Sequence, residues 1–428
     1  MLSRMEHDSI GALNVPAEAY YGVQSIHAAT NFQITHRLLH PVLIDSIVMV
    51  KKAAAITNEK SGKLDQQIAQ AIIQACDEIL DGNLRDQFIV DAIQGGAGTS
   101  ANMNANEVIA NRAIEILGGT KGDYSIVHPN DHVNMSQSTN DVIPTAGKIT
   151  VLKLLPQTIK ELEKLEKAME EKEAEFDDIL KMGRTQLQDA VPMRLGQSFG
   201  AFAHVLKRDI KRLKNVMDEM KVLNIGATAI GTAINVDPYY LANISYELSK
   251  VAGISLKQAD DLIDATQNLD GFVSVSGVLK TCAVDISKIS NDLRLMSSGP
   301  RTGLSEINLP ARQNGSSIMP GKINSVIPEV VSQVAYLIIG HDYTITMAAE
   351  AGQCEEYIEK SVGISTALCP YIGYAKSAEI AKKSLKTGIS VKELVLEEGL
   401  LNEEELKEIL KPEKMTQLMR EKVMKAVS

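Results

Sequence analysis

Four stretches of this chain repeat apolar residues every three or four positions over about 25 residues or more, and this pattern limits the fold most. In the stretch 272–296, which has no internal proline, these residues are Phe272, Val275, Leu279, Cys282, Ile286, Ile289, Leu293 and Met296. The spacing predicts a helix roughly 38 Å long. Similar spacing predicts helices at roughly 140–174, 196–222 and 327–350, with stripe residues such as Leu155, Ile159, Leu162, Val330, Val334 and Leu337. Helices of this length favour a mainly α fold with an elongated bundle.

The rest of the chain is expected to form shorter elements. The first 130 residues are rich in turn signals, and the last 70 predict short helices rich in Lys and Glu. A length of 428 residues exceeds the usual single core, so two or three domains are expected.

Composition excludes several classes of protein. A formal net charge of -10 argues against a nucleic-acid or anionic membrane surface, so a small anionic substrate would need a local positive pocket. No apolar run approaches the length of a membrane span and the start lacks a signal-peptide core, so a cytoplasmic protein is expected. Four scattered cysteines without a CxxC pair indicate neither disulfides nor a zinc site; they are Cys76, Cys282, Cys354 and Cys369.

The segment 315–325 is the strongest candidate for chemistry. It places Ser316, Ser317, Lys322 and Asn324 in a nearly charge-free stretch bracketed by glycines. Serine is a poor base unless its alkoxide is stabilised, so an active Ser316 or Ser317 would need a cation such as Lys322 and nearby N–H donors. Asn324 offers an amide that can bind a carboxylate. The alternative is an ordinary polar connection, which most stretches of this composition are.

Three further polar segments share this character. Residues 95–107 form a glycine-rich turn with Thr99 at the start of a predicted helix, a geometry that suits an anion or a plain helix cap. Residues 134–141, with Ser138, Thr139 and Asn140, precede a long helix and hold more polar groups than a cap needs. Residues 183–190 place Thr185 and Gln186 in a turn before another helix, next to Arg184, which is a carboxylate clamp by type or a surface residue.

Neither a metal nor a nucleotide site is indicated. His128 and His132 have helical ligand spacing, but Pro129 separates them and no third ligand is near in sequence. No glycine-rich nucleotide motif occurs. We therefore expect neither a metal nor an organic cofactor.

Together the four segments resemble the aspartase/fumarase superfamily. Gly-Ser-Ser-Ile-Met-Pro-Gly-Lys-Ile-Asn at 315–324 is similar to its signature, and the other three segments are similar to its substrate-binding regions. The resemblance extends over almost the whole chain. It implies a three-domain fold divided at 1–139, 140–353 and 354–428, and a homotetramer whose active sites combine residues from three subunits.

Within the superfamily the chain is most similar to the aspartate ammonia-lyase branch, through 20–24, 183–192 and 224–232. That branch converts L-aspartate to fumarate and ammonia through an enediolate, without a cofactor. A class II-type fumarase acting on L-malate is the nearest alternative, because 128–134 suits both branches. Fumarases typically have histidine at the position of Gln186, however.

The resemblance also implies a role for each site residue. Ser316 would be the general base that takes the C3 proton, and Lys322 would help to keep it ionised. Lys322 and Asn324 would hold the α-carboxylate, and Asn140 would orient the amino group. The β-carboxylate and the enediolate would contact Thr99, Ser138, Thr139 and Thr185, and Gln186 belongs to the same substrate-binding set.

The chain departs from the family at three places. Ser325 replaces a usual proline, and Cys369-Pro370-Tyr371 replaces Asn-Pro-His. Near 350–357 the chain passes directly to its C-terminal part and so lacks roughly 40 residues, about one long helix plus a connection. A shortened, non-catalytic member that serves in assembly or binding is therefore a second hypothesis.

Overall fold

In the computed structural model, the described residues are 2–8, 10–351, 368–387 and 389–410. They belong to two compact units. The first unit comprises 1–150, 221–268 and the C-terminal part from 353, and the second comprises 151–220 and 269–352. The predicted junction at 350–357 lies outside the described residues from position 352 onward.

The first unit is a helical body with two small strand pairs. Helix α2 packs against α3 and α7, and α3 packs against α4. Strands β1 (Ser3–His7) and β2 (Ala12–Pro16) are antiparallel, whereas β5 (Val222–Leu223) and β6 (Lys257–Gln258) are parallel. The helices are α1 (Val23–Asn31), α2 (Pro41–Lys60), α3 (Gln66–Leu80), α4 (Thr99–Ile116), the start of α5 (Thr139–Glu175), α7 (Pro238–Ala252) and α8 (Leu262–Gln267). The turn-rich beginning of the chain therefore holds more helix than predicted, because α2 alone has 20 residues.

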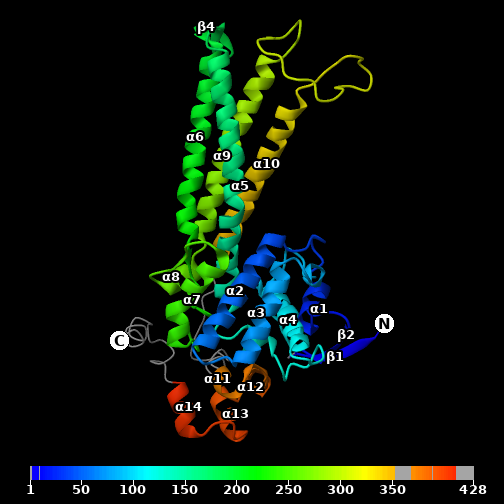
Figure 1. The fold of residues 1–428 in the computed structure, drawn as a ribbon, viewed down its shortest axis with the longest axis vertical. Coiled ribbons are helices and arrows are strands. Elements are labelled where there is room, and N and C mark those ends of the chain that lie inside the picture. The colour runs from blue at the N-terminus through cyan, green and yellow to red at the C-terminus, as the bar shows by residue number, and fades with distance from the viewer. Residues whose placement is uncertain (1, 9, 352–367, 388, 411–428) are drawn as a thin grey trace. The chain divides into compact units, whose positions relative to one another are not determined.

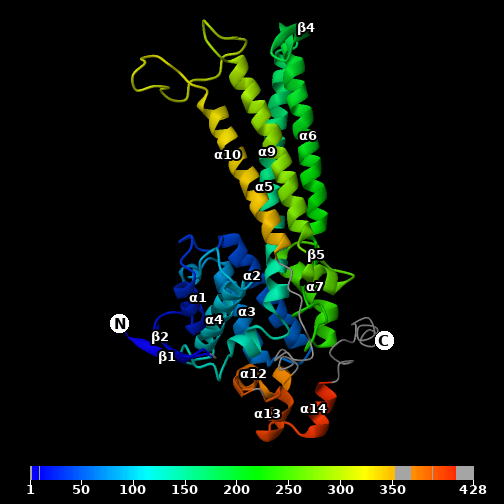
Figure 2. The ribbon, with the colours of Figure 1, turned by 180° about the vertical axis from the view of Figure 1, so that it is seen from behind.

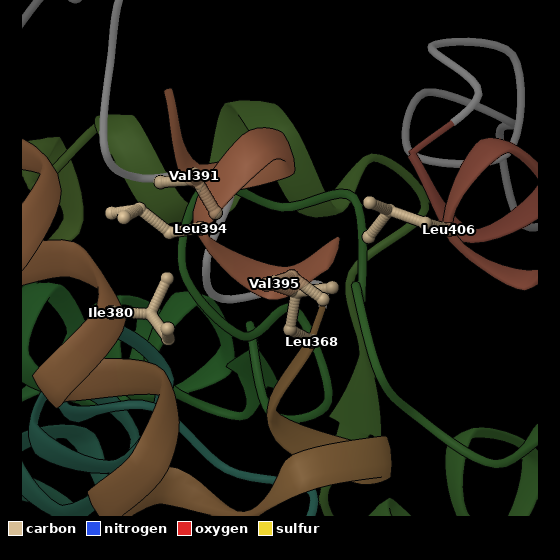
Figure 3. Packing of buried hydrophobic residues seen from close by; sticks show 6 residues of the cluster. All are labelled: Leu368, Ile380, Val391, Leu394, Val395 and Leu406. Atoms are coloured by element: carbon tan, nitrogen blue, oxygen red, sulfur yellow. The ribbon is translucent and has the colours of Figure 1, made fainter. Parts of the chain in front are cut away.

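The C-terminal part of the first unit has its own small core. Its helices are α11 (Cys369–Ile372), α12 (Tyr374–Thr387), α13 (Val391–Glu397) and α14 (Glu403–Ile409), as short as the sequence predicts. Helices α13 and α14 each begin with a capping box, Ser390 with Glu393 and Asn402 with Glu405. Figure 3 shows the buried cluster that these helices share: Leu368, Ile380, Val391, Leu394, Val395 and Leu406.

The second unit is a bundle of long helices. It holds the larger part of α5 together with α6 (Leu195–Met220), α9 (Asp270–Met296) and α10 (Val326–Glu350), which run alongside one another in both views (Figures 1 and 2). The hairpin of β3 (Leu180–Thr185) and β4 (Gln188–Arg194) joins α5 to α6. The mainly α fold and the four long helices are thus confirmed, with ends within about two residues of the prediction.

The apolar stripes of these helices differ in burial. Leu155, Ile159 and Leu162 on α5 are at most 6% exposed. Val330, Val334 and Leu337 on α10 are 46%, 50% and 58% exposed, although the same spacing predicted that they would pack. Among the described residues α10 packs mainly against α9, so most of its apolar surface meets no neighbour.

No helix in the described part of the chain combines the length and the apolar character needed to cross a membrane.

Candidate active site

The turn before α4 brings Thr99 close to the start of α5. Gly98 has a φ of +87°, and a Cβ placed on it would lie 2.9 Å from Ile143 on α5. Only glycine fits this close approach. The Thr99 hydroxyl is exposed and donates to the carbonyl of Gly96 at 2.7 Å. The oxygen of Thr99 therefore remains open on the outside of the turn.

Buried polar side chains hold the segment 134–141 in place through hydrogen bonds. The amide oxygen Oδ1 of Asn134 accepts hydrogen bonds from Lys51 Nζ at 2.8 Å, Asn102 Nδ2 at 3.2 Å and Asn106 Nδ2 at 3.3 Å. Asn102 Nδ2 also lies 3.2 Å from Thr139 Oγ1, to which it donates. Helices α2 and α4 therefore hold the loop that carries Ser138 and Thr139.

Lys51 is fully buried in an otherwise apolar part of α2. Burial lowers the pKa of Lys51 to about 7, against the opposing charge of Asp141. No sequence motif pointed to Lys51, because a lysine next to Lys52 on a helix usually faces solvent. Its one signal is the apolar run that surrounds it.

Asp141 connects the same loop to the segment 224–232. Its carboxylate accepts from the backbone N–H of Ser138 at 2.8 Å, of Gly226 at 3.0 Å and of Thr228 at 3.1 Å. Burial nevertheless raises the pKa of Asp141 to about 7, which exceeds the lowering effect of these hydrogen bonds. Asp141 thus fixes two polar loops through one buried side chain.

The amide of Asn140 has a defined orientation. Its Nδ2 donates to the carbonyl of Ala229 at 2.7 Å, and its own backbone carbonyl accepts from Asn224 Nδ2 at 3.0 Å. A carbonyl partner requires the nitrogen on that side. The exposed Oδ1 of Asn140 is therefore an acceptor, which suits a donor such as an ammonium group.

In the second unit, Thr185 and Gln186 lie at the tip of the β3–β4 hairpin. Thr185 pairs with Gln188, and Gln186 and Leu187 make the turn with φ angles of 52° and 61°. Both candidate side chains are exposed. The sequence predicted a turn before another helix, and the turn is confirmed; the strand β4, which the sequence did not predict, lies between this turn and α6.

Arg184 is not a free carboxylate clamp. Its Nη1 donates to Glu306 Oε1 at 2.5 Å, and its Nε lies 3.7 Å from the carboxylate of Asp189. The guanidinium thus already pairs with carboxylates of the protein itself.

The segment 315–324 closes on itself between α9 and α10. Gly315 N donates to the carbonyl of Lys322 at 2.8 Å, and Asn324 Nδ2 donates to the carbonyl of Gly315 at 3.0 Å. A Cβ on Gly315 would lie 2.8 Å from the Asn324 side chain, so this close approach requires glycine. Nδ2 of Asn324 keeps its second hydrogen for another acceptor.

Ser316 occupies the centre of this loop. Its Oγ accepts from the backbone N–H of Ile318 at 3.2 Å and of Met319 at 3.1 Å. Ser316 is half-buried, whereas Ser317 and Lys322 are exposed. The ammonium group of Lys322 makes no ion pair with the described residues. Of the two serines, Ser316 is the one whose oxygen receives N–H donors.

The predicted residues therefore form two sets. Thr99, Ser138, Thr139 and Asn140 belong to the first unit, and Thr185, Gln186, Ser316, Lys322 and Asn324 belong to the second. The structure brings the members of the first set together through Asn102, Asn134 and Asp141. In the second unit, Glu306 of the connection between α9 and α10 binds the hairpin through Arg184 and Lys181.

The two histidines of 128–134 accept hydrogen bonds from backbone N–H groups of the same segment. His128 Nδ1 accepts from the N–H of Asn130 and of Asp131, and His132 Nδ1 accepts from the N–H of His128 at 2.9 Å. In the described ranges no cluster of three His, Cys, Asp or Glu side chains could hold a metal ion.

The comparisons with known proteins agree with these motifs. Residues 11–340 match the family described as Lyase, and residues 364–417 match the family described as Fumarase C C-terminus. An aspartate ammonia-lyase from Bacillus sp is 50% identical over 455 aligned positions, which cover 96% of this chain and 97% of the relative.

Two solved structures share the fold. One, described as fumarate lyase:delta crystallin from Brucella melitensis, has a TM-score of 0.81 and 46% identity, covering 97% of this chain and 100% of its own. A class II fumarase from Schistosoma mansoni has a TM-score of 0.78 and 32% identity, covering 97% and 99%.

The length of the Bacillus alignment bears on the predicted shortfall. Of this chain's 428 residues, 96% is about 411, so about 44 of the 455 positions have no residue of this chain. That number is close to the roughly 40 residues expected from the motifs. Over its matched length, the chain belongs to the aspartase/fumarase superfamily of lyases.

Proposed function

We propose that the chain is a carbon–nitrogen lyase that removes ammonia from L-aspartate to give fumarate. Its relatives with 46–50% identity include aspartate ammonia-lyases, whereas the fumarase of known structure is 32% identical. Gln186 supports the same branch, because the histidine typical of fumarases is absent from this position.

The observation that carries the mechanism is the surroundings of Ser316 Oγ. Abstraction of the C3 proton requires an oxygen that is negative before the reaction, and two backbone N–H groups donate to this oxygen. Fixed donors of this kind stabilise an alkoxide at no cost in reorganisation. Ser316 is therefore the general base, and the exposed ammonium of Lys322, six positions further along the same loop, supplies the positive charge that its ionised form needs.

The other residues bind the substrate and the enediolate. Lys322 and the second amide hydrogen of Asn324 hold the α-carboxylate, while the hydroxyls of Ser138, Thr139 and Thr185 donate to the β-carboxylate. The Thr99 hydroxyl, whose hydrogen bonds the carbonyl of Gly96 in the free protein, turns to donate to the same carboxylate when the substrate binds. As electrons move onto this carboxylate, the same donors bind it more tightly, which lowers the barrier. The acceptor Oδ1 of Asn140 orients the ammonium group, and Gln186 lies beside Thr185 in the same set.

The active form is proposed to be a cytoplasmic homotetramer with sites shared between subunits. The family resemblance supplies both the shared sites and the number of subunits. The three-domain division at 139/140 and 353/354, and the absence of one long helix near 350–357, are part of the same proposal.

The direct test compares two substrates. Purified protein should release ammonia from L-aspartate with a rise in the ultraviolet absorbance of fumarate, and should leave L-malate unchanged. Faster turnover of malate would assign the chain to the fumarases. Inertness toward both substrates, in a folded protein whose intact mass agrees with 428 residues, would favour the shortened, non-catalytic member.

A further inference from the structure

The hydroxyl of Thr139 has a buried neighbour that determines its direction. Thr139 is the first residue of α5 and is half-buried. Its Oγ1 accepts a hydrogen bond at 3.2 Å from Nδ2 of Asn102, a residue of α4 that is 1% exposed. A hydroxyl has a single hydrogen, so while this bond holds, the hydrogen of Thr139 cannot lie toward Asn102. The hydroxyl is therefore left to donate in another direction.

The orientation of the Asn102 amide is itself determined by its second partner. The same nitrogen, Nδ2, donates to Oδ1 of Asn134 at 3.2 Å. If the amide of Asn102 were turned over, its oxygen would face the oxygen of Asn134, and two acceptors form no hydrogen bond. Nδ2 of Asn102 thus uses one hydrogen on Asn134 and the other on Thr139.

The amide of Asn134 is fixed at both of its ends. Its Nδ2 donates to the backbone carbonyl of Gln137 at 3.2 Å, and its Oδ1 accepts from Nζ of Lys51 at 2.8 Å. A carbonyl can only accept, so the nitrogen of Asn134 must face Gln137 and the oxygen must face Lys51. The hydrogen bonds from Lys51 through Asn134 and Asn102 to Thr139 therefore have one defined set of donors and acceptors.

We propose that Asn102 is a positioning residue, which keeps the Thr139 hydroxyl as a donor toward a carboxylate of the substrate. The inference rests on the proposed function for the identity of the substrate, but it requires of that substrate only a carboxylate. Its residues all belong to the first unit of a single chain, so it does not depend on how subunits share the site. Asn102 is buried and acts only through Thr139.

The direction of this hydroxyl matters when negative charge accumulates on the substrate. In the proposed reaction the β-carboxylate gains charge as the enediolate forms, and a donor already directed toward it stabilises that charge without reorganisation. Without Asn102, the hydroxyl of Thr139 is free to turn its hydrogen inward and to present a lone pair to the carboxylate. Thr139 would then lose most of its contribution to binding and to the rate.

The chain offers a matched control on the same helix. Asn106 lies four positions further along α4, is equally buried, and also donates through Nδ2 to Oδ1 of Asn134, at 3.3 Å. Its nitrogen otherwise contacts Sδ of Met103, at 3.5 Å, where Asn102 contacts Thr139. The Oδ1 atoms of Asn102 and Asn106 are alike too, since both are buried and lack a hydrogen-bond partner among the described residues. Replacement of either by alanine removes similar support from Asn134, but only Asn102→Ala also releases Thr139.

The experiment measures kcat/KM with L-aspartate for Asn102→Ala, Asn106→Ala, Thr139→Val and the two double variants that contain Thr139→Val. Thermal unfolding should shift by a similar amount in the two alanine variants. Asn106→Ala should lower kcat/KM about threefold through the shared support, whereas Asn102→Ala and Thr139→Val should each lower it about 10- to 100-fold, as expected for a lost hydrogen bond to a charged group. Equal effects of the two alanine variants on kcat/KM would overturn the proposal.

The double variants separate a positioning role from a purely structural one. When Thr139 is valine, Asn102 has no hydroxyl to direct, so the two alanine substitutions should then differ in kcat/KM by less than about twofold. If Asn102→Ala exceeded Asn106→Ala by the same factor with and without the hydroxyl, Asn102 would be structural only and the proposal would be overturned.

An isosteric pair of variants serves if the alanine variants are too unstable to purify. Asn102→Asp keeps the shape of the side chain but replaces its donor by an acceptor, which draws the hydrogen of Thr139 inward. It should lower kcat/KM at least as much as Asn102→Ala is expected to do, and several times more than Asn106→Asp. Equal values for the two aspartate variants would contradict the role of Asn102.

A further readout does not depend on turnover. Succinate is a dicarboxylate without an amino group to lose, and calorimetry gives its dissociation constant. Asn102→Ala should weaken succinate binding several times more than Asn106→Ala, and equally when Thr139 is valine. This pattern in a parent that is inert toward L-aspartate would contradict the proposed function and leave the role of Asn102 standing. A parent that binds no succinate would overturn both, because Thr139 would have no carboxylate to bind.

Discussion

The segments 138–140 and 315–324 carry similar side chains for the same proposed substrate, but the protein supports them in different ways. The first lies on buried polar groups, in which Asn134 and Asp141 each accept three hydrogen bonds. The second is an exposed loop closed mainly by its own backbone, with Ser316 held by two N–H groups of the same loop.

Because of this difference, substitutions in the two segments should have different effects on stability and on the reaction. A substitution in the buried support of the first segment should damage folding and binding together, because the polar groups around it lose their partners. A substitution in the second segment should damage the reaction alone, because water can replace what is lost at an exposed loop.

The largest effect is expected for Ser316→Ala. Removal of the general base should lower kcat by about 1,000-fold or more, since general-base catalysis contributes on the order of 100- to 10,000-fold. The temperature of unfolding should stay within about 1 °C, because the two N–H groups released are near the surface. Steady-state kinetics and calorimetry measure both quantities. Ser317→Ala is the control and should retain most activity. A similar loss of kcat in the two variants would contradict the assignment of Ser316, rather than Ser317, as the base.

The next effect is expected for Asp141→Ala, and it concerns stability. Three buried backbone N–H groups would lose their acceptor, which costs about 3 kcal/mol or more of unfolding free energy at about 1 kcal/mol or more each. Denaturant unfolding measures this cost. Asp260→Ala removes an exposed carboxylate of the same unit and should cost less than about 0.5 kcal/mol. Equal costs for the two variants would contradict the claim that Asp141 supports both loops.

Lys322→Ala should affect the reaction through both KM and kcat. Loss of a charged contact to the substrate carboxylate and to the ionised Ser316 should lower kcat/KM about 100-fold, a cost of about 2.7 kcal/mol. Lys322→Arg keeps the charge and should recover part of the loss. If Lys322→Ala changed stability alone, the segment 315–325 would be an ordinary polar connection and not part of the active site.

A further effect is a dependence of stability on pH. Because burial raises the pKa of Asp141 to about 7, the folded protein keeps this proton between about pH 4 and 7 while the unfolded chain releases it. The contribution of Asp141 to stability should therefore fall as pH rises through this window, by up to about 1.4 kcal/mol per pH unit.

Asp141→Asn removes this titration and keeps one acceptor oxygen, so the unfolding free energy of the parent should decline relative to the variant between pH 4 and 7. The charge that faces Asp141 is Lys51, whose own pKa is lowered to about 7 and which therefore titrates mainly above this window. Parallel pH profiles for parent and variant would show that the carboxylate is already ionised at pH 4.

The sequence predicted the helical class, the four long helices and the polar segments, because each rests on local spacing. It did not predict what connects the segments. Lys51 and Asn134 are 83 positions apart, and Arg184 and Glu306 are 122 apart, so neither contact leaves a local pattern. The hairpin strand before α6 was missed for another reason: its exposed residues show no alternation of apolar and polar side chains.

Periodicity also could not distinguish the two apolar stripes. Leu155 on α5 is 5% exposed and Leu337 on α10 is 58% exposed, although both follow the same spacing. A stripe predicts a face that favours burial, but burial also requires a neighbour. The exposed face of α10 agrees with the proposal that a long helix of the family is absent from this chain.

In the proposed reaction, Ser316 exchanges a proton at C3 while ammonia, rather than water, joins or leaves the neighbouring carbon. The most direct measurement supplies fumarate and ammonium in deuterated water and identifies the product by mass spectrometry. We expect L-aspartate carrying one deuterium at C3, formed by the parent and at least about 1,000-fold more slowly by Ser316→Ala. Deuterated malate as the main product, or aspartate formed equally fast without Ser316, would contradict the proposed reaction.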